Sequence, residues 1–379
     1  MPTLHDATEE TKKLLLYGGI GVAVLILIVF IIKAYISTIK TPPTPPTMCY
    51  GKVPLPQLPQ NATYAKLTYH LQTISGNLPY FSTKIFVPRI ATPQPDLLAL
   101  DNASNSATAM GFTLPPVEIS NNTFEWTKDA QLTKTLQINV LSHNFFLNST
   151  FLGDQTVASG VNLPADSDAN GIVQAFYTNV LSGLNDTIAS SIDVADPVIT
   201  HYQLQNNTLS LLTNDAFTPQ IIRVDYNQNP IQNCYIDANG SSKSCPIYYS
   251  NYPNTTVNAI IGAENQVDDA DVPTLNIIQS EYFPVNIANT SCSDSSMQAT
   301  YPLRSVQDAY SDLIKAVAHK TAIVSYSGSN NQVVVTDVKL AYLSVDKEGQ
   351  QYLLPVYVFL GQDNFVAFVS AITDEATQM

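Results

Sequence analysis

The stretch SVQDAYSDLIKAVAH, residues 305–319, predicts the fold class because it has the pattern of an amphipathic helix. Ser305 with Asp308 three residues later is typical of a helix N-terminus. One apolar stripe follows at helical spacing and comprises Val306, Ala309, Tyr310, Leu313, Ile314 and Val317. A stripe of this kind has to pack against a second layer of structure.

Strand-like segments follow this helix and supply that layer. They are TAIVSYS (321–327), QVVVTDVKLAYLSV (332–345), QYLLPVYVFLG (351–361) and NFVAFVSAI (364–372). Segment 352–359 is apolar on both faces, so we expect the helix to cover one face and other chain to cover the second. Pro355 predicts a sheet edge or a bulge, because proline cannot donate to a ladder. A helix followed by antiparallel strands indicates the α+β class.

The C-terminal segment 301–372 resembles the cystatin-like and PepSY-like units of bacterial envelope proteins, which include the YycH and YycI accessory proteins. YPLRSVQDAYSDL (301–313) is similar to their helix, and VKLAYLSVD (338–346) with YLLPVYVFLG (352–361) is similar to their strands. The resemblance implies a membrane-tethered, non-enzymatic domain that binds or modulates another protein. It names no partner, and no functional residue transfers from it.

The N-terminal region contains an uncharged apolar run from Leu14 to Ile32, LLLYGGIGVAVLILIVFII, with lysines on both sides. About 20 apolar residues suffice to cross a hydrocarbon core of ~30 Å. We expect a transmembrane helix over residues 14–36. A cleaved signal peptide is the alternative, but no small-residue cleavage site follows the run. Residues 1–13 would then be a cytoplasmic tail, and the C-terminal region would lie outside the cell membrane.

Residues 37–60 contain TPPTPPT (41–47) and read as a proline-rich spacer, since such chain extends as polyproline II at ~3.1 Å per residue. A ligand for a proline-recognising domain is the alternative, which would need a cytosolic location. The remaining chain predicts a two-lobed α+β ectodomain of antiparallel sheets, each with a packed helix. Its expected parts are an α+β lobe over 61–165, a β-rich lobe over 166–300 and the C-terminal unit over 301–379. Trp126 is expected in the core.

The four cysteines favour a disulfide-bonded, extracytoplasmic domain. Cys234 and Cys245 flank a hairpin turn signal at Asn239-Gly240, so we expect a bridge between them. Cys49 and Cys292 either form a second bridge or remain free. Asn-x-Ser/Thr triplets mark exposed loops if the host glycosylates, and polar turns if it does not. They begin at Asn61, Asn102, Asn121, Asn148, Asn185, Asn206, Asn239, Asn254 and Asn289.

One segment, DSDANGIVQAFY (166–177), matches the first half of a calcium loop through Asp166, Asp168 and Asn170. Its twelfth position is Tyr177, where such loops have a bidentate carboxylate. The alternative is a helix whose polar entry contains two aspartates. A second acidic cluster, QVDDADVP (266–273), is typical of a solvated loop.

The net charge of -14 disfavours a nucleic-acid partner. The sequence contains no hydrolase or phosphate-binding motif, although a His-Asp pair or two carboxylates brought together by folding could still act. We therefore predict a non-enzymatic, single-pass membrane protein that binds or modulates another envelope protein. One alternative is a structural surface protein, an adhesin or lattice subunit that binds itself, and another is an anchored glycan-acting hydrolase.

Overall fold

The computed structural model divides the chain into two compact units, Met1–Pro45 and Pro46–Met379. It describes residues 15–22, 24–31, 33, 44–59, 67–94, 96–128, 133–153, 163–212, 218–237, 240–262, 277–288, 292, 297–345 and 349–378. In the first unit, residues 15–22, 24–31 and 33 are helical. Within the part of the chain that is described, no helix has both the length and the apolar character needed to cross a membrane.

The second unit contains a nine-stranded antiparallel sheet with order β4-β5-β6-β7-β15-β14-β10-β8-β9. Its strands are β4 (Val117–Ser120), β5 (Thr123–Lys128), β6 (Lys134–Asn139), β7 (Phe145–Ser149), β15 (Ile277–Tyr282), β14 (Val257–Gly262), β10 (Ile221–Asp225), β8 (Val198–Gln205) and β9 (Thr208–Leu211). The expected division at residue 165 does not separate two sheets. Strand β7 lies before it and β15 after it, and the two pair with Leu147 opposite Ser280.

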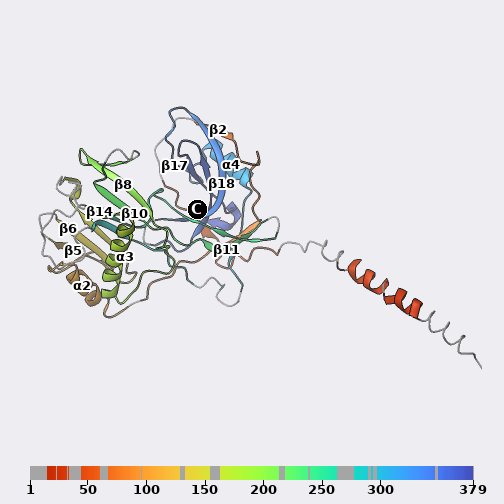
Figure 1. Cartoon of the computed structure of the whole chain (residues 1–379), viewed down its shortest axis with the longest axis horizontal. Helices are drawn as coiled ribbons and strands as arrows, with labels where there is room; N and C mark the ends of the chain where they lie inside the picture. Colours follow the sequence, from red (N-terminus) through yellow and green to blue (C-terminus); the bar gives the residue numbers. More distant parts are fainter. Residues whose placement is uncertain are drawn as a thin grey trace, which may run out of the picture. The chain divides into compact units, whose positions relative to one another are not determined.

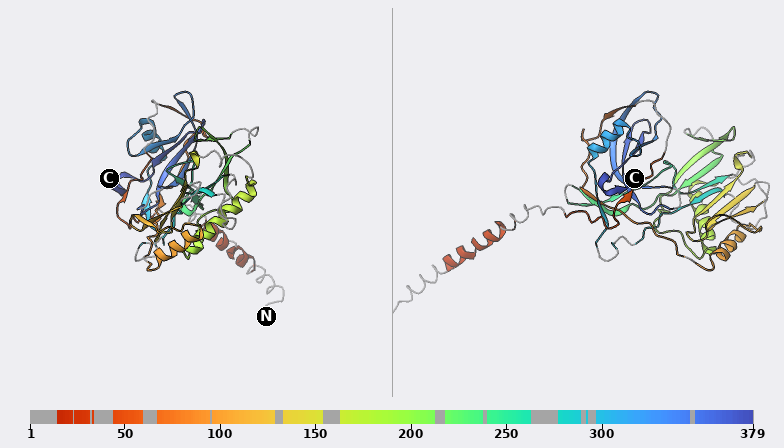
Figure 2. Two further views of the ribbon diagram at one scale, coloured as in Figure 1. Left: turned by 90° about the vertical axis from the view of Figure 1, so that its left-hand side faces the viewer. Right: turned by 180° about the vertical axis from the view of Figure 1, so that it is seen from behind.

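Two helices, α2 (Ala99–Ala109) and α3 (Asp166–Gly183), pack on one face of this sheet (Figures 1 and 2). Gly111 follows α2 with a φ of 81°, a conformation that glycine adopts readily. Trp126 is buried beneath the helices with 1% exposure, as the sequence predicts. The helices also contact each other closely, and the Ser106 hydroxyl donates to the Val180 carbonyl at 2.7 Å.

A six-stranded sheet forms the second core. It comprises β13 (Ile247–Tyr249), β18 (Gln332–Ser344), β19 (Leu354–Gly361), β20 (Val366–Ser370) and β17 (Thr321–Ser325) in that order, with β2 (Thr68–Leu71) also paired to β18. Strands β2 and β13 run parallel to β18, and the other pairs are antiparallel. The predicted C-terminal unit thus contributes most of this sheet, while two strands come from earlier chain.

Helix α4 (Val306–Lys315) packs against β17 and β20, and the Ser305 hydroxyl accepts from the Asp308 amide at 3.1 Å. Ala309, Tyr310 and Leu313 are buried, which confirms the centre of the predicted stripe. Its end differs from the prediction. Ile314 is 51% exposed, and Ala316 takes a left-handed conformation that ends the helix before residue 317.

Both faces of β19 are covered, as the apolar segment requires. Tyr357 and Phe359 belong to the core cluster that includes the α4 side chains, whereas Val356 and Val358 belong to a separate cluster on the other face. The second cluster is completed by Leu58, Val366 and Phe368 among others. The burial therefore agrees with the prediction, in which the helix covers one face and other chain covers the second.

Pro355 lies in an interior strand, in regular register opposite Tyr342, rather than at the predicted sheet edge or bulge. The Pro355 carbonyl accepts from the Ala371 amide at 3.2 Å. In a regular antiparallel pair the residue at position 355 would also donate its N–H to the Ala371 carbonyl, but proline has no N–H. The amide of Arg304 donates to that carbonyl instead, at 3.0 Å. A third segment therefore supplies the donor that proline lacks, and no ladder group is left unsatisfied there.

The described end of the predicted spacer belongs to the second unit rather than to an extended strut. The Met48 amide donates to the Thr300 carbonyl, and the Thr47 amide donates to the Thr300 hydroxyl, both at 3.0 Å. Strand β1 (Val53–Pro54) pairs in parallel with β21 (Thr377–Gln378). Val53 and Leu58 are also buried in the cores. The spacer is therefore shorter than predicted, because its described C-terminal part is packed in the second unit.

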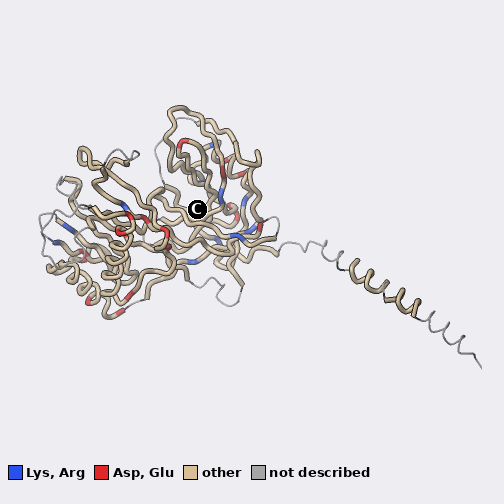
Figure 3. The backbone as a smooth tube through the Cα atoms, viewed as in Figure 1, with Lys and Arg blue, Asp and Glu red and all other residues tan. Residues whose placement is uncertain are grey.

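The remaining short elements connect these sheets. They are β3 (Lys84–Phe86) paired with β16 (Thr300–Pro302), the hairpin of β11 (Ile231–Ile236) and β12 (Ser242–Cys245), and two single-turn helices, η1 (Phe151–Gly153) and η2 (Asp374–Ala376). Charged side chains are spread thinly through the described part of the second unit, and residues 15–31 of the first unit contain none (Figure 3). Apolar burial and backbone ladders are therefore the main sources of stability.

Candidate binding cleft

A cleft of about 750 Å³ lies within the second unit, where turns of the nine-stranded sheet meet the loop that follows β18. Its described lining comprises Arg89, Ile90, Ala91, Thr92, Pro93, Asn121, Asn122, Asn139, Leu141, Ser142, His143, Asn144, Asp186, Phe283, Pro284, Val285, Asn286, Ser344, Val345, Gly349, Gln350 and Gln351. The volume is in the range of small-molecule pockets. Carboxamide and hydroxyl side chains are frequent in it.

The β6–β7 turn forms one wall and is shaped by Asn139. The Asn139 side-chain oxygen accepts from the Leu141 and Ser142 amides at 3.1 and 3.0 Å, a local hydrogen-bond pattern that asparagine favours in turns. Its Nδ2 donates to the Thr123 hydroxyl at 3.2 Å. His143 then adopts a φ of 58°, which reverses the chain direction. The turn is therefore held by side-chain bonds and projects toward the end of α3.

His143 and Asp186 join this turn to the residues after α3. Nδ1 of His143 lies 2.7 Å from Oδ2 of Asp186, and the side chains are 24% and 45% exposed. Oδ1 of Asp186 accepts from the Thr187 amide at 2.7 Å. An exposed ion pair contributes only about 0–1 kcal/mol to stability, so its main effect is to position the imidazole at the cleft.

The opposite wall contains Gln350, which braces the connection between β18 and β19. Its Oε1 accepts from the Val345 amide at 3.0 Å, and its Nε2 donates to the Leu343 and Tyr352 carbonyls at 2.9 and 3.0 Å. The crossing segment next to it is held by backbone bonds, with the Ile90 amide donating to the Gln351 carbonyl at 2.9 Å. Both walls are thus ordered by internal hydrogen bonds.

Several lining carboxamides have no side-chain partner among the described residues: Asn122, Asn144, Asn286 and Gln351. A carboxamide offers both donors and an acceptor, which suits polypeptide backbone groups. Phe283 is the single phenylalanine, tyrosine or tryptophan in the described lining, so the walls offer few large rings for stacking on a sugar. The described walls therefore offer mainly hydrogen-bond donors and acceptors to whatever enters the cleft.

Folding does create His-Asp pairs, which the sequence left open. Besides His143 and Asp186, Nε2 of His201 lies 2.9 Å from Oδ1 of Asp166. Asp186 is the only carboxylate in the described lining of the cleft, whereas glycoside hydrolysis needs two. All four cysteines form disulfides, so none is a free nucleophile.

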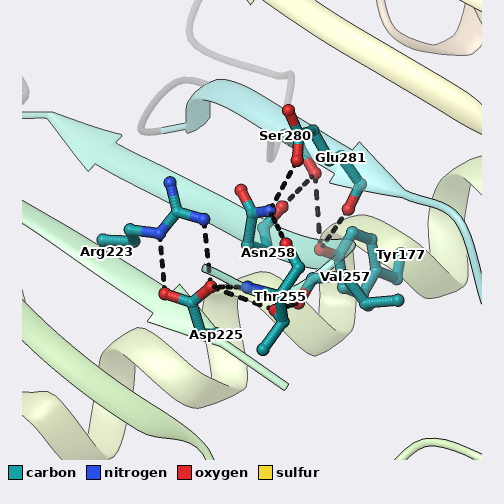
Figure 4. Close-up of polar contacts among 8 residues, drawn as sticks. All are labelled: Tyr177, Arg223, Asp225, Thr255, Val257, Asn258, Ser280 and Glu281. Atoms are coloured by element: carbon teal, nitrogen blue, oxygen red, sulfur yellow. Dashed lines mark hydrogen bonds and ion pairs between the residues drawn. The ribbon is translucent and has the colours of Figure 1, made fainter. Parts of the chain in front are cut away.

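A second polar cluster lies inside the nine-stranded sheet (Figure 4). The Arg223 guanidinium makes a bidentate contact with Asp225, in which Nε donates to Oδ2 at 2.6 Å and Nη2 donates to Oδ1 at 3.0 Å. The amide and hydroxyl of Thr255 both donate to Asp225 Oδ1 at 3.0 Å. Asn258 donates to the Thr255 carbonyl at 2.8 Å and to Glu281 at 2.9 Å.

This cluster is structural rather than a binding site. The Arg223 and Asp225 side chains are only 12% and 8% exposed. Burial lowers the pKa of Arg223, but hydrogen bonds to Asp225 and its charge outweigh that and raise it overall. The Asp225 carboxylate thus joins β10 to Thr255, which lies just before β14, and the Arg223 guanidinium compensates its buried charge.

The predicted calcium ligands do not form a loop. Asp166, Asp168 and Asn170 all lie in the first two turns of α3, where residues two apart project in different directions. Asp166 pairs with His201, and the side-chain oxygen of Asn170 accepts from the Tyr226 hydroxyl at 2.7 Å. The described residues include no group of three or more metal-ligating side chains. The acidic cluster at residues 268, 269 and 271 lies outside the described residues.

The disulfides join Cys234 to Cys245, as predicted, and Cys49 to Cys292, which the sequence left open. The first closes the β11–β12 hairpin, whose turn includes Gly240 with a φ of 81°. Two disulfides suggest an extracytoplasmic domain, because thiols stay reduced in most cytosols.

Sequon asparagines differ in exposure. Asn121, Asn148, Asn185 and Asn206 are exposed, Asn102 and Asn254 are half-buried, and Asn61, Asn239 and Asn289 lie outside the described residues. Sequence reasoning did not identify the cleft at all. Its described walls come from six separate stretches of chain, and the only local signal was the asparagine-rich turn chemistry near residues 121 and 139.

No protein-family model matches the sequence, and no curated protein matches it. Among solved structures, the chain is similar to an uncharacterized protein from Eubacterium rectale ATCC 33656. The alignment covers 84% of this chain and 92% of that one, with 10% identity and a TM-score of 0.33. A likeness at this level supports no argument about function.

Proposed function

We propose that this chain is a single-pass, membrane-anchored extracytoplasmic protein that binds or modulates another envelope protein and catalyses no reaction. The observation that carries the proposal is the cleft, which combines ordered walls with carboxamides that have no side-chain partner in the described chain. A polar partner segment would satisfy these groups, since unpaired polar groups lose hydrogen bonds when water is excluded.

The membrane part of the proposal rests on the sequence. Residues 14–32 are uncharged and apolar, lysines flank them, and the disulfides favour an outer location for the second unit. The C-terminal unit also resembles the tethered YycH and YycI type of envelope protein, which implies binding rather than catalysis. We therefore place the N-terminus inside the cell and the second unit outside.

The spacer available to such an anchor is shorter than its proline content implies. Because Thr47 and Cys49 are already attached to the second unit, only chain before Pro46 can separate that unit from the membrane. Twelve or so residues of extended chain span roughly 40 Å at most. The chain at Pro46 would therefore lie within about that distance of the membrane.

Site-specific photocrosslinking in intact cells tests the proposal. A photoreactive amino acid replaces Asn286 or Gln351 in the cleft of the full-length protein, and Ile314 on the exposed side of α4 serves as the control position. We expect both cleft positions to capture one envelope protein, identified by mass spectrometry, and the control position to capture much less of it.

Other outcomes separate the alternatives. Equal capture of that protein at Ile314 would place the contact outside the cleft and contradict the assignment. Capture of only the chain itself would favour the structural surface protein. A released sugar product from purified protein incubated with cell-wall glycan would favour the hydrolase.

A further inference from the structure

We propose that Asn148, Asn185 and Asn206 carry N-linked oligosaccharides, whereas the sequons at Asn102 and Asn254 remain unmodified. This inference rests on the proposed extracytoplasmic location of the second unit and on a host that glycosylates asparagine, and it does not depend on partner binding. A sequon alone predicts little, since it arises often in a chain rich in asparagine and threonine. The fold separates sequons that can carry a sugar from those that cannot.

The three selected sites share two features. Each asparagine is exposed, and so is the threonine two residues later, Thr150, Thr187 or Thr208. Both groups must be accessible if an oligosaccharyltransferase is to bind the sequon in the folded protein. The attached sugar must also end in solvent, because burying its hydroxyl groups without hydrogen bonds is unfavourable.

Backbone conformation supports two of these sites. Asn185 and Asn206 have φ values of 56° and 51°, in tight reversals that follow α3 and β8. Asparagine tolerates this conformation better than most residues, and the reversal turns the side chain out of the neighbouring secondary structure. Asn148 instead lies within β7 and is exposed on the sheet.

The excluded sites fail for different physical reasons. Asn102 is half-buried beside Ala103 and Ser106, which lie in the contact between α2 and α3. At Asn254 the third residue of the sequon, Thr256, is 4% exposed, and its hydroxyl donates to the Phe283 carbonyl at 2.9 Å. Asn121 is exposed, but Thr123 is half-buried and its hydroxyl accepts from the Asn139 side chain, so this sequon does not meet both requirements.

The co-reactant would be an oligosaccharide linked to a lipid phosphate. The asparagine side-chain nitrogen forms a bond to the anomeric carbon, the bond from that carbon to the phosphate oxygen breaks, and the lipid phosphate leaves. One proton is lost from the carboxamide. No oxidation or reduction takes place.

Protease digestion and mass spectrometry of the full-length protein from the membranes of its native cells test the proposal. We expect sugar masses on peptides containing Asn148, Asn185 and Asn206, and bare peptides at Asn102 and Asn254. Bare peptides at all three selected sites would overturn the proposal. Equal occupancy at Asn102 or Asn254 would overturn the role of exposure.

Threonine variants provide the matched controls. Thr187→Ala retains Asn185 but removes the sequon, so the sugar at Asn185 should be lost while the other two remain. Thr187→Ser retains the sequon and should leave the sugar in place. Retention of the Asn185 mass in Thr187→Ala would show that the added group is not an N-linked sugar.

Discussion

Cys49 and Cys292 lie 243 residues apart in sequence and are joined by a disulfide that attaches the start of the second unit to chain preceding β16. Cys234 and Cys245 are only 11 apart. Because a cross-link restricts the unfolded chain more when it closes a longer loop, the two bridges should differ in their effect on stability.

Replacing each cysteine pair by alanine tests this difference. We expect Cys49→Ala with Cys292→Ala to lower the free energy of unfolding by roughly 5 kcal/mol, and Cys234→Ala with Cys245→Ala by roughly 3 kcal/mol. Denaturant unfolding of the oxidised proteins measures both. A larger loss from the short bridge would show that native hairpin contacts, rather than chain entropy, dominate.

Two glycines of α3 should respond to alanine in opposite directions. A Cβ at Gly183 would lie 2.6 Å from the Ser106 Cβ, so Gly183→Ala should separate α2 from α3 and cost about 1–3 kcal/mol. Gly171 has no atom within 4 Å of such a Cβ, so Gly171→Ala should stabilise by up to ~1 kcal/mol through helix propensity. Thermal unfolding distinguishes them, and equal shifts would contradict the close helix contact.

Removing one partner of the buried Arg223–Asp225 ion pair should lower the stability of the protein strongly. Arg223→Met leaves the Asp225 charge buried without its partner and should lower the free energy of unfolding by about 3–5 kcal/mol. Lys320→Met breaks the pair with Asp374, which is 63% exposed, and should cost about 1 kcal/mol or less. Chemical denaturation compares the two variants. A similar decrease in the free energy of unfolding for both variants would mean that the buried pair contributes no more to stability than the exposed one.

Alkaline pH should destabilise the second unit through its buried tyrosines. Burial raises the pKa of Tyr248, Tyr282 and Tyr301 from 10.0 to about 12. Above pH 10 the unfolded chain loses these protons while the folded chain keeps them, so stability is complete below pH 10 and falls as pH rises toward 12. Denaturation midpoints across this range measure the decline.

A single variant checks that assignment. Tyr248→Phe removes one of the raised groups and should make the decline above pH 10 less steep, with little change in stability at neutral pH. An unchanged slope would show that Tyr248 ionises normally in the folded protein.

Local features were predictable because neighbouring residues produce them. The cap at Ser305, the hairpin between Cys234 and Cys245, and the burial of the segment around Tyr357 all follow from residue types at short spacing. The same logic failed at Pro355. The donor that satisfies the Ala371 carbonyl comes from Arg304, far away in sequence, and no local pattern records it.

The sequence by itself determined the α+β class, the N-terminal apolar segment, the short disulfide and the centre of helix α4. Tertiary structure decided that β7 pairs with β15 in one nine-stranded sheet, that Cys49 reaches Cys292, and that His143 meets Asp186 at a cleft. The physical reason is distance along the chain. Periodicity reports which face of an element is buried, whereas strand partners and clefts depend on which buried faces pack together.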